Sequence, residues 1–431
     1  MFRPAHFELA CELLRLILTG RTPADKRMEH YFRAHREMGS HDRGYVAETV
    51  YGCLRNKRVL QALCGDGNVI AEDLTAAYLR MYGELTAEAV MRLDRNDRVR
   101  GLMQRLETAD IAALPVAVRS NLPDWLWESL VQQFGEEDAL QLAEALNRPA
   151  LVDLRVNTLK TTREQLQAEL AAEDYAAQTT PYAPQGLRRA DRKPLFSTPA
   201  FQGGRFEVQD EGSQLLSLLL EPQPKERVVD FCAGGGGKTL HLGNLMNNTG
   251  ALYAFDVHEH RLERLKPRVR RAGLSNVRAQ LIKNERDPQI KRLRGTIHRV
   301  LVDAPCSGTG TLRRNPDTKW RELDLPALVA QQRDILAAAA TLVKPGGRLV
   351  YATCSLLRAE NEDIVDEFLK QHDDFIRVPV NDILARLNIP LTMPGLDLRL
   401  FPHTHATDGF YGAVLEKKVA ALPPPASPVA V

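Results

Sequence analysis

The sequence contains no run of 18 or more apolar residues, so it predicts no helix that spans a membrane. The segment from Met1 to Gly20 carries two glutamates and no small-residue cleavage site, which predicts an amphipathic helix rather than a signal peptide. The six cysteines are scattered and form no CxxC pair, which argues against a zinc site. We therefore expect free thiols in a reducing cytoplasm, with no bound metal and no membrane partner. Of these cysteines, Cys11, Cys53 and Cys64 lie in apolar helical segments and are expected in a core.

The sequence also lacks a strong excess of either charge, since 57 Lys and Arg accompany 55 Asp and Glu. A net charge of +2 does not exclude nucleic acid as a partner, because basic residues can cluster while the total stays near zero. The 44% hydrophobic and 26% charged residues are typical of a soluble globular protein. A chain of 431 residues predicts two or three domains, and we expect a monomer.

The pattern of apolar residues divides the chain into four parts. Residues 1–120 have apolar residues at helical spacing, which predicts a helical domain. Residues 121–205 predict a helical bridge followed by a small α+β unit. Residues 206–418 alternate between strand and helix, and the proline-rich residues 419–431 are expected to be disordered.

The alternation over residues 206–418 predicts an α/β fold of the Rossmann type, with a parallel-rich sheet and helices on both faces. The strands that we expect in this sheet are Arg227–Cys232, Ala251–Val257, Val277–Ile282, Arg299–Ala304, Arg348–Thr353, Phe375–Val378 and Tyr411–Glu416. In the preceding small unit we expect strands at Val152–Asn157 and Gly186–Arg189 and a helix at Arg163–Ala171.

A glycine-rich turn follows the first strand of the large sheet and predicts a nucleotide site. The turn consists of Cys232, Ala233, Gly234, Gly235, Gly236, Gly237 and Lys238. Four successive glycines between a strand and a helix permit close approach of the backbone to a ligand. The next strand carries Asp256 near its end, where an acid is placed to accept hydrogen bonds from ribose hydroxyls. Together these features predict an adenosine-containing ligand.

Other interpretations of the turn are a structural connection, a phosphate-binding P-loop and the site of a dinucleotide oxidoreductase. A P-loop needs a glycine five residues before Gly237, where this sequence has Cys232. No residues for hydride chemistry accompany the turn. Neither enzyme alternative accounts for Cys306 and Cys354.

These two cysteines follow two consecutive predicted strands. Cys306 comes shortly after Asp303 at the end of one strand, and Cys354 comes directly after the end of the next. The residues from Leu323 to Val343 suffice for one crossover helix, so the two strands are expected to be neighbours. Both thiols and Asp303 would then lie at the carboxyl edge of the sheet, beside the glycine turn. The alternative is a pair of buried structural cysteines.

Two such thiols suit methylation of cytosine at carbon 5. That carbon is a poor nucleophile until a thiolate adds to carbon 6 and gives an enamine that attacks an electrophilic methyl group. The proton on carbon 5 must then leave so that the thiolate can be eliminated, and a second group assists this release. Asp303 can hydrogen-bond the amino edge or the ring nitrogen of the cytosine. Position alone does not decide which cysteine attacks.

Basic residues outnumber acids between His258 and Arg299, and another basic group follows the Cys306 turn. Such residues supply phosphate contacts, although a basic helix face is otherwise simply solvated. The residues that we predict to contact RNA are Arg264, Arg268, Arg313, Arg314 and Lys319. RNA is favoured over duplex DNA because the target base must be unstacked to reach a thiol. Pro267 is expected to kink or split its helix, and Trp320 to pack in a core.

The motifs resemble those of the RsmB-type RNA cytosine carbon-5 methyltransferases. The resemblance spans essentially all of residues 206–418 and rests on Val208–Gln214, Cys232–Lys238, Asp303–Gly308, Arg314–Asp317, Tyr351–Ser355, Glu360–Glu362 and Asp408–Tyr411. Leu154–Lys160 resembles the small RNA-recognition-like unit of that family. Residues Asp42–Arg55 more weakly resemble its NusB-type RNA-binding domain.

The resemblance implies a class I methyltransferase domain that binds S-adenosylmethionine and acts on RNA, with small-subunit (16S) ribosomal RNA as the expected target. It also implies that Cys354 is the nucleophile and that Cys306 promotes product release. Two positions depart from the family's pattern. Gly235 stands where the usual loop has proline, and Asn284 lies near the place where many relatives have an acid on the adenine side. Asn284 can still hydrogen-bond adenine.

Two further functions stay open at the level of sequence. One is a non-catalytic RNA-binding factor for ribosome assembly, against which the intact Cys306 and Cys354 weigh. The other is a tRNA or DNA cytosine methyltransferase. Activity on unmodified RNA and none on duplex DNA would separate an RNA enzyme from a DNA enzyme.

Overall fold

The computed structural model describes residues 3–65, 67–94, 99–191 and 193–419. The chain forms two compact units, each assembled from separate segments. The helical unit comprises Met1–Ala150, Gly308–Leu323 and Phe401–Ala406, and the α/β unit comprises Leu151–Ser307, Asp324–Leu400 and Thr407–Val431. The predicted disordered tail, apart from Val419, lies outside the described residues.

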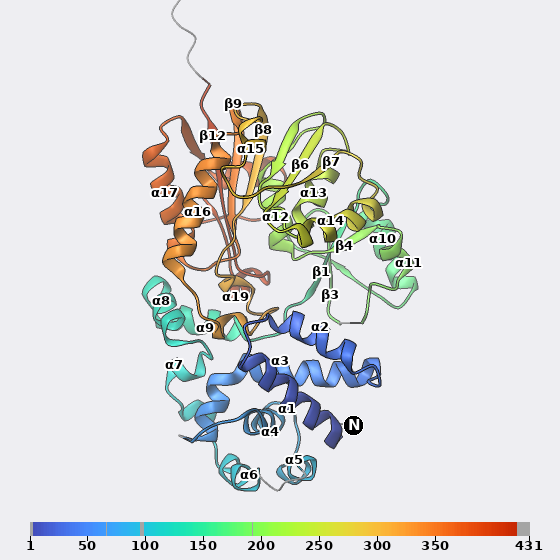
Figure 1. The fold of residues 1–431 in the computed structure, drawn as a ribbon, viewed down its shortest axis with the longest axis vertical. Coiled ribbons are helices and arrows are strands. Elements are labelled where there is room, and N and C mark those ends of the chain that lie inside the picture. The colour runs from blue at the N-terminus through green and yellow to red at the C-terminus, as the bar shows by residue number, and fades with distance from the viewer. Residues whose placement is uncertain (1–2, 66, 95–98, 192, 420–431) are drawn as a thin grey trace, which may run out of the picture. The chain divides into compact units, whose positions relative to one another are not determined.

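The helical unit is built from helices (Figure 1), and those between residues 4 and 107 pack around one apolar core. Its elements are α1 Pro4–Leu18, α2 Ala24–Ala34, α3 Ser40–Cys64, α4 Ala71–Met81, α5 Ala87–Leu93, α6 Arg100–Glu107, α7 Val116–Arg119, α8 Asp124–Phe134, α9 Glu136–Leu146 and α19 Pro402–His405, with the 3₁₀ turns η1 Ile111–Ala113, η2 Thr309–Thr311 and η3 Thr318–Trp320. The core holds Cys11, Cys53 and Cys64, as predicted. Among the described residues, no helix is long and apolar enough to cross a membrane.

The segment that follows the Cys306 turn packs with the helical unit rather than with the sheet. The indole Nε1 of Trp320 donates to the Leu54 carbonyl at 2.7 Å. The Ala24 amide donates to Asp317 Oδ2 at 3.0 Å. The prediction that Trp320 packs against a core is therefore confirmed.

A small antiparallel sheet begins the α/β unit. Its strand order is β2-β3-β1-β4, where β1 is Val152–Val156, β2 is Gln178–Thr179, β3 is Gly186–Arg189 and β4 is Phe206–Val208. Helices α10 Arg163–Ala172 and α11 Pro199–Gln202 accompany it. One side of the sheet forms an apolar core with Leu154, Leu166 and Phe206. The two predicted strands and the predicted helix of this unit are confirmed.

The large sheet has the order β10-β12-β9-β8-β5-β6-β7, with β11 paired to β12. Its strands are β5 Arg227–Asp230, β6 Ala251–Asp256, β7 Val277–Leu281, β8 Ile297–Asp303, β9 Val343–Thr353, β10 Phe375–Val378, β11 Leu398–Leu400 and β12 Phe410–Lys417. The five strands from β5 to β9 pair in parallel, and β12 pairs antiparallel with β9, β10 and β11. The predicted parallel-rich α/β fold is confirmed.

Helices cover both faces of the large sheet because successive strand residues point to opposite sides (Figure 1). Val229, Val300 and Leu349 pack with one set of helices, whereas their neighbours in sequence pack with the other. The helices of this region are α12 Glu211–Leu219, α13 Gly237–Leu245, α14 Glu259–Ala272, α15 Pro288–Lys291, α16 Leu325–Ala340, α17 Glu362–Gln371 and α18 Val380–Arg386, with the 3₁₀ turn η4 Arg358–Glu360.

Helix α14 runs through Pro267 without a break, so the proline does not split the helix, and the alternative that it kinks the helix stays a prediction. Pro267 is exposed, and a proline on the solvent side leaves the freed carbonyl accessible to water.

Candidate active site

The structure brings the thiols of Cys306 and Cys354 together. Strands β8 and β9 are parallel neighbours, with Asp303 beside Ala352 in the register. The two Sγ atoms lie 3.2 Å apart, and the Cys354 amide donates to Cys306 Sγ at 3.3 Å. Both side chains are half-buried. The predicted neighbouring position of the two cysteine turns is confirmed, and thiols this close can act on the same substrate ring.

Lys238 places a positive charge beside the thiols. It stands in the first turn of α13, and its Nζ forms an ion pair with Asp303 Oδ2 at 2.7 Å. Burial alone lowers the pKa of Lys238, but the charge and hydrogen bond of Asp303, with a smaller contribution from Cys354, raise it overall. Lys238 therefore stays protonated at neutral pH, next to an acid and a thiol.

The glycine turn links β5 to α13 in a conformation that only glycine adopts easily. Gly236 is the N-cap residue of α13, with a φ of 87°. A Cβ added to Gly236 would lie 2.1 Å from Leu265 Cδ1. A Cβ added to Gly234 would meet no atom within 4 Å. The turn is thus packed against α14 at Gly236 but open at Gly234, which leaves room for a ligand beside the backbone.

Asp256 ends β6 and holds this turn in place. Its Oδ2 accepts the Gly234 amide at 2.8 Å, and its Oδ1 accepts the His258 amide at 2.8 Å. The side chain is buried. Each carboxylate oxygen has a second lone pair, so both hydrogen bonds are compatible with the predicted contact to a ribose hydroxyl.

Two groups under the turn are deeply buried. Asp230 accepts the Thr239 hydroxyl at 2.7 Å through Oδ2, while its Oδ1 has no hydrogen-bond partner. Burial, together with the nearby Asp303, raises the pKa of Asp230 to about 7 against the effect of Thr239. Burial also raises the pKa of the Cys232 thiol well above its ordinary value. Cys232 is therefore a poor nucleophile at neutral pH.

Side chains from the small sheet and from α14 fix the outside of the turn. Arg155 of β1 donates to the Gly237 carbonyl at 2.7 Å and to Gln209 Oε1. Arg268 of α14 donates to the Gly235 carbonyl and to Glu207. Burial lowers the pKa of Arg155 to about 9. The turn is therefore held by contacts from sequence positions far before and after it.

Comparison with known proteins identifies the family. Residues 217–416 match the family described as 16S rRNA methyltransferase RsmB/F, and residues 122–194 match the RsmF/B-like ferredoxin-like domain. A probable ribosomal RNA small subunit methyltransferase B from Synechocystis sp. is 32% identical to this chain over 446 residues, covering 95% of this chain and 99% of the relative. The chain belongs to the RsmB/F methyltransferase family.

Two further comparisons extend this result. A 28S rRNA (cytosine-C(5))-methyltransferase from Mus musculus is 33% identical over 320 residues, which cover 70% of this chain and 40% of the mouse protein. The solved structure of the protein PH0851 superimposes with a TM-score of 0.79 at 28% identity, covering 97% of this chain and 99% of that chain. The match to PH0851 thus extends over nearly the whole methyltransferase.

Most of the predicted site residues lie close together in the methyltransferase. The glycine turn, Lys238 and Asp303 meet at the carboxyl edge of the sheet with the two thiols. Asn284 is exposed, and its Oδ1 accepts the Arg286 amide at 2.9 Å within its own turn. Its contact with adenine stays a prediction. Among the described residues, no group of three or more His, Cys, Asp or Glu side chains is arranged to hold a metal ion.

The predicted RNA contacts need correction at two positions. Lys319 is 2% exposed, and its ammonium donates to the Arg55 carbonyl at 2.9 Å and to Asn147 Oδ1 at 2.6 Å. Arg313 is also buried. Arg268 is bound to Gly235 and Glu207. The buried side chains of Lys319 and Arg313 cannot reach a phosphate without a rearrangement, whereas the half-buried Arg268 stays a predicted contact.

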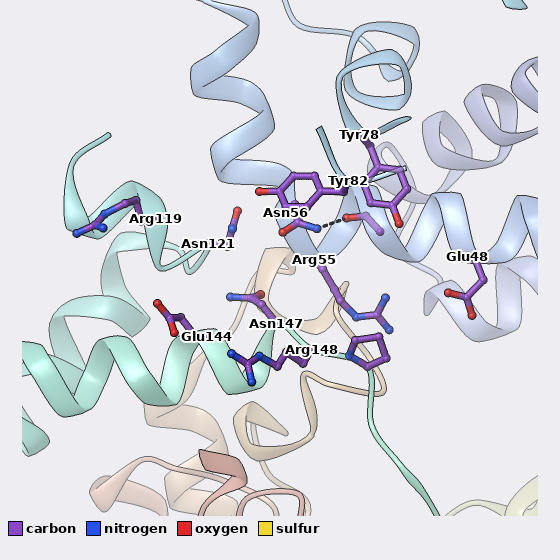
Figure 2. Close-up of a pocket in the computed structure, with 12 residues that line it drawn as sticks. Glu48, Arg55, Asn56, Tyr78, Tyr82, Arg119, Asn121, Glu144, Asn147 and Arg148 are labelled. Carbon is purple, nitrogen blue, oxygen red and sulfur yellow. Dashed lines mark hydrogen bonds between the residues drawn. The ribbon is translucent and has the colours of Figure 1, made fainter. Parts of the chain in front are cut away.

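A pocket in the helical unit is lined in part by Arg55 and Asn147 (Figure 2). These two residues accept the hydrogen bonds of the buried Lys319. The pocket has a volume of about 370 Å³, and its walls include Arg119, Arg148 and Tyr82. The rings of Tyr78 and Tyr82 stack with centroids 5.9 Å apart. Figure 2 shows both tyrosines on the side opposite Arg148. No local sequence pattern indicates this pocket, since its residues come from α3, α4, α7 and the region around α9.

The sequence prediction also missed the residues that position the site. Arg155 and Gln209 lie in stretches that carry the family resemblance, but nothing local indicates that Arg155 binds the glycine turn and that Gln209 binds Arg155. The Lys238–Asp303 pair joins residues from two predicted site motifs, whose side chains could have been paired by charge alone. Glu360 was part of a matching stretch and had no predicted role.

Proposed function

We propose that this methyltransferase transfers a methyl group from S-adenosylmethionine to carbon 5 of a cytosine in small-subunit ribosomal RNA. The observation that carries the proposal is the 3.2 Å separation of the Cys306 and Cys354 sulfur atoms at the edge that also presents Lys238 and Asp303. The printed names of the Synechocystis and mouse relatives support ribosomal RNA as the substrate, and the mouse name supports cytosine carbon 5 as the target atom.

The residues at the sheet edge fit S-adenosylmethionine, which when bound supplies an electrophilic methyl group. The backbone is open at Gly234, where an added Cβ would meet no atom within 4 Å. We propose that the turn from Cys232 to Lys238 holds the amino-acid end of S-adenosylmethionine. Asp256 would accept from the ribose hydroxyls, and Asn284 would contact the adenine.

The first chemical role belongs to Cys354. Its thiolate adds to carbon 6 of the cytosine, forming a carbon–sulfur bond and giving carbon 5 the electron density to accept a methyl group. The positive charge of Lys238 lies close enough to interact electrostatically with Cys354. Asp303 binds Lys238 through Oδ2, and its Oδ1 would accept a hydrogen bond from the amino group of the cytosine.

The second role belongs to Cys306. After carbon 5 has gained the methyl group, its proton passes to Cys306, which acts as the base in its thiolate form. The electrons of that carbon–hydrogen bond restore the ring double bond as the bond to Cys354 breaks. Because Cys306 Sγ lies 3.2 Å from Cys354 Sγ, it is within reach of a ring carbon next to the one bound by Cys354.

RNA would be held in part by the pocket of the helical unit. Arg148 is exposed and Arg119 is half-buried at its walls, so both can approach phosphate groups. Tyr82 is 37% exposed and offers a face on which an unpaired base can stack. Arg264 is exposed on α14 and stays a predicted contact, as does Arg314.

The proposed function is tested by incubating the full chain with labelled S-adenosylmethionine and unmethylated small-subunit ribosomal RNA. We expect one methylated cytosine position by bisulfite sequencing, and no transfer to duplex DNA of the same sequence. Cys354→Ala should abolish transfer while cofactor affinity stays within about twofold of wild type, because Cys354 follows β9 rather than the glycine turn. Substantial turnover by this variant would refute the role of Cys354.

The role of Cys306 makes a different prediction. Cys306→Ala should methylate the base but fail to release it, so RNA should stay attached through Cys354 in a band that resists denaturation. The double variant Cys306→Ala/Cys354→Ala is the matched control and should show no such band. A Cys306→Ala enzyme that turns over at the wild-type rate without an adduct would contradict the assignment.

A further inference from the structure

Glu360 connects the two turns that carry the cysteines. It lies at the end of η4, and its side chain is fully buried. Its Oε1 accepts the Ser307 amide at 2.8 Å, and its Oε2 accepts the hydroxyl of Ser307 at 2.5 Å and that of Ser355. Ser307 directly follows Cys306 and Ser355 directly follows Cys354. One carboxylate therefore binds the residue next to each thiol.

A glutamine completes this arrangement. Gln332 of α16 donates through Nε2 to Glu360 Oε1 at 2.9 Å and to the Pro305 carbonyl at 2.9 Å. Pro305 directly precedes Cys306. The Cys306 turn is thus held on both sides, by Ser307 and by Pro305. On the other turn, Asn361 donates to the Ser355 carbonyl at 3.0 Å.

The hydrogen bonds of Glu360 engage both oxygens of its carboxyl group. Each oxygen accepts two donors, which uses the full acceptor capacity of a carboxylate. These donors are an amide, a side-chain amide and two hydroxyls, all of them neutral. A buried carboxylate held only by neutral donors is costly to desolvate, and the charge-assisted hydrogen bonds offset that cost only if every donor stays in place. The carboxylate therefore fixes the donors to one geometry.

We propose that Glu360 is a positioning residue that sets the distance between the Cys306 and Cys354 thiols. The inference rests on the proposed function, since the two thiols matter for catalysis only if both act on the same base. It adds a residue that touches neither substrate nor cofactor. Glu360 acts through Ser307 and Ser355, and Gln332 ties the same carboxylate to α16.

The first test is Glu360→Gln, which keeps the size of the side chain. It replaces one carboxylate oxygen, which accepts two hydrogen bonds, with an NH₂ group that can only donate. We expect kcat to fall about 10- to 100-fold, because a displacement of about 1 Å between reacting groups has an effect of that size. KM for S-adenosylmethionine should stay within about twofold of wild type. Ser307→Ala and Ser355→Ala, which each remove one hydroxyl, should show smaller losses in the same direction.

Tyr411→Phe is the matched control. The Tyr411 hydroxyl donates to the buried carboxylate of Asp397 at 2.6 Å, a hydrogen bond that involves no residue of either cysteine turn. Removal of this hydrogen bond reports the general effect of losing a buried hydroxyl–carboxylate contact. We expect kcat of Tyr411→Phe to stay within about twofold of wild type.

The second test measures the thiol distance without RNA. Diamide takes two electrons and two protons from a pair of thiols and leaves a disulfide. We expect wild-type protein and Tyr411→Phe to form the Cys306–Cys354 disulfide rapidly, as detected by mass spectrometry of the linked peptides. Glu360→Gln should form it at least about tenfold more slowly, because a disulfide tolerates little change in sulfur position.

Wild-type cross-linking and wild-type kcat in Glu360→Gln would overturn the proposal. If that variant does not fold, the double variant Ser307→Ala/Ser355→Ala decides in its place, and wild-type rates there would overturn the proposal equally. The cross-linking rates do not depend on the substrate. An enzyme that methylates no cytosine but still cross-links more slowly without Glu360 would refute the proposed function and leave the positioning role intact.

Discussion

Three aspartates at the carboxyl edge of the large sheet have different environments and therefore different chemistry. Asp303 is paired with the cation of Lys238, and Asp256 accepts two backbone amides. Asp230 has only the Thr239 hydroxyl, and its second oxygen has no partner. Burial, with a contribution from Asp303, accordingly raises the pKa of Asp230 to about 7.

The raised pKa of Asp230 predicts a pH-dependent stability. In the unfolded chain the group titrates near 3.8, so the folded protein holds the proton more tightly between about pH 4 and pH 7. The free energy of unfolding should therefore fall as pH rises through that range, by at most about 4 kcal/mol. Asp230→Asn carries no titrating proton and should lose this dependence, so it should become more stable relative to wild type as pH rises.

Urea unfolding at pH 5 and pH 8 measures this difference. The control is Asp382→Asn, since Asp382 is exposed on α18 and its replacement should leave the pH dependence unchanged. Parallel stability curves for wild type and Asp230→Asn would contradict the raised pKa.

At the level of elements, apolar alternation predicted the central strands to within two residues at most of their ends. It failed where a strand is built from unusual residues. Strand β9 begins at Val343, five residues before its predicted start, because Pro345 and the glycines after it resemble a turn. In the structure they lie at a register shift between β8 and β9. The three-residue strand β11 was missed because its pairing to β12 is the only sign of it.

The site itself could be predicted only as far as its motifs reach. The thiols, the glycine turn and Asp303 follow strand ends, so their meeting at one edge follows from a parallel sheet. The contacts that hold these groups in place do not follow from the parallel sheet. Arg155 reaches Gly237 from 82 positions away, and Glu360 reaches Ser307 from 53. No local pattern records such pairings, because they depend on how the elements pack.

The packing of the glycine turn predicts the effect of a substitution on stability and on cofactor binding. Gly236→Ala puts a residue with a side chain at a φ of 87° and within 2.1 Å of Leu265 Cδ1, so we expect a loss of about 2–4 kcal/mol in the free energy of unfolding. S-adenosylmethionine binding should weaken as well, by isothermal titration calorimetry. Gly235→Ala is the control, because its added Cβ would lie 3.5 Å from Arg268 Nη1, and it should cost at most about 0.5 kcal/mol. Equal effects of the two variants would contradict the packing of Gly236.

At the scale of the whole molecule, the chain leaves the α/β unit directly after the Cys306 turn and returns at Asp324. The segment in between, Gly308–Leu323, belongs to the helical unit and places the buried cation of Lys319 there. Burial, together with Arg55 and Lys57, lowers the pKa of Lys319 well below its ordinary value. Lys319 is thus part of the interior of the helical unit, and RNA has to be bound by other basic residues.

Because the net charge is only +2, RNA affinity has to come from local contacts, and the pocket with Arg119 and Arg148 is the place where we expect them. The double variant Arg119→Ala/Arg148→Ala should bind a small-subunit ribosomal RNA fragment roughly tenfold more weakly at 0.1 M salt. The slope of log affinity against log salt should become shallower by about 1 to 2, since each lost phosphate contact removes about 0.7 to 0.9. Fluorescence anisotropy across a salt series measures both quantities.

Arg33→Ala separates this local effect from a general loss of charge. Arg33 is exposed on α2, pairs with Glu29 at 2.6 Å and does not line the pocket, so its removal should leave the affinity within about twofold and the salt slope unchanged. The double pocket variant should keep its wild-type kcat at saturating RNA while its KM for RNA rises, because the thiols and the glycine turn belong to the other unit. An unchanged salt slope in the double variant, or the same loss in Arg33→Ala, would mean that RNA is bound elsewhere on the chain.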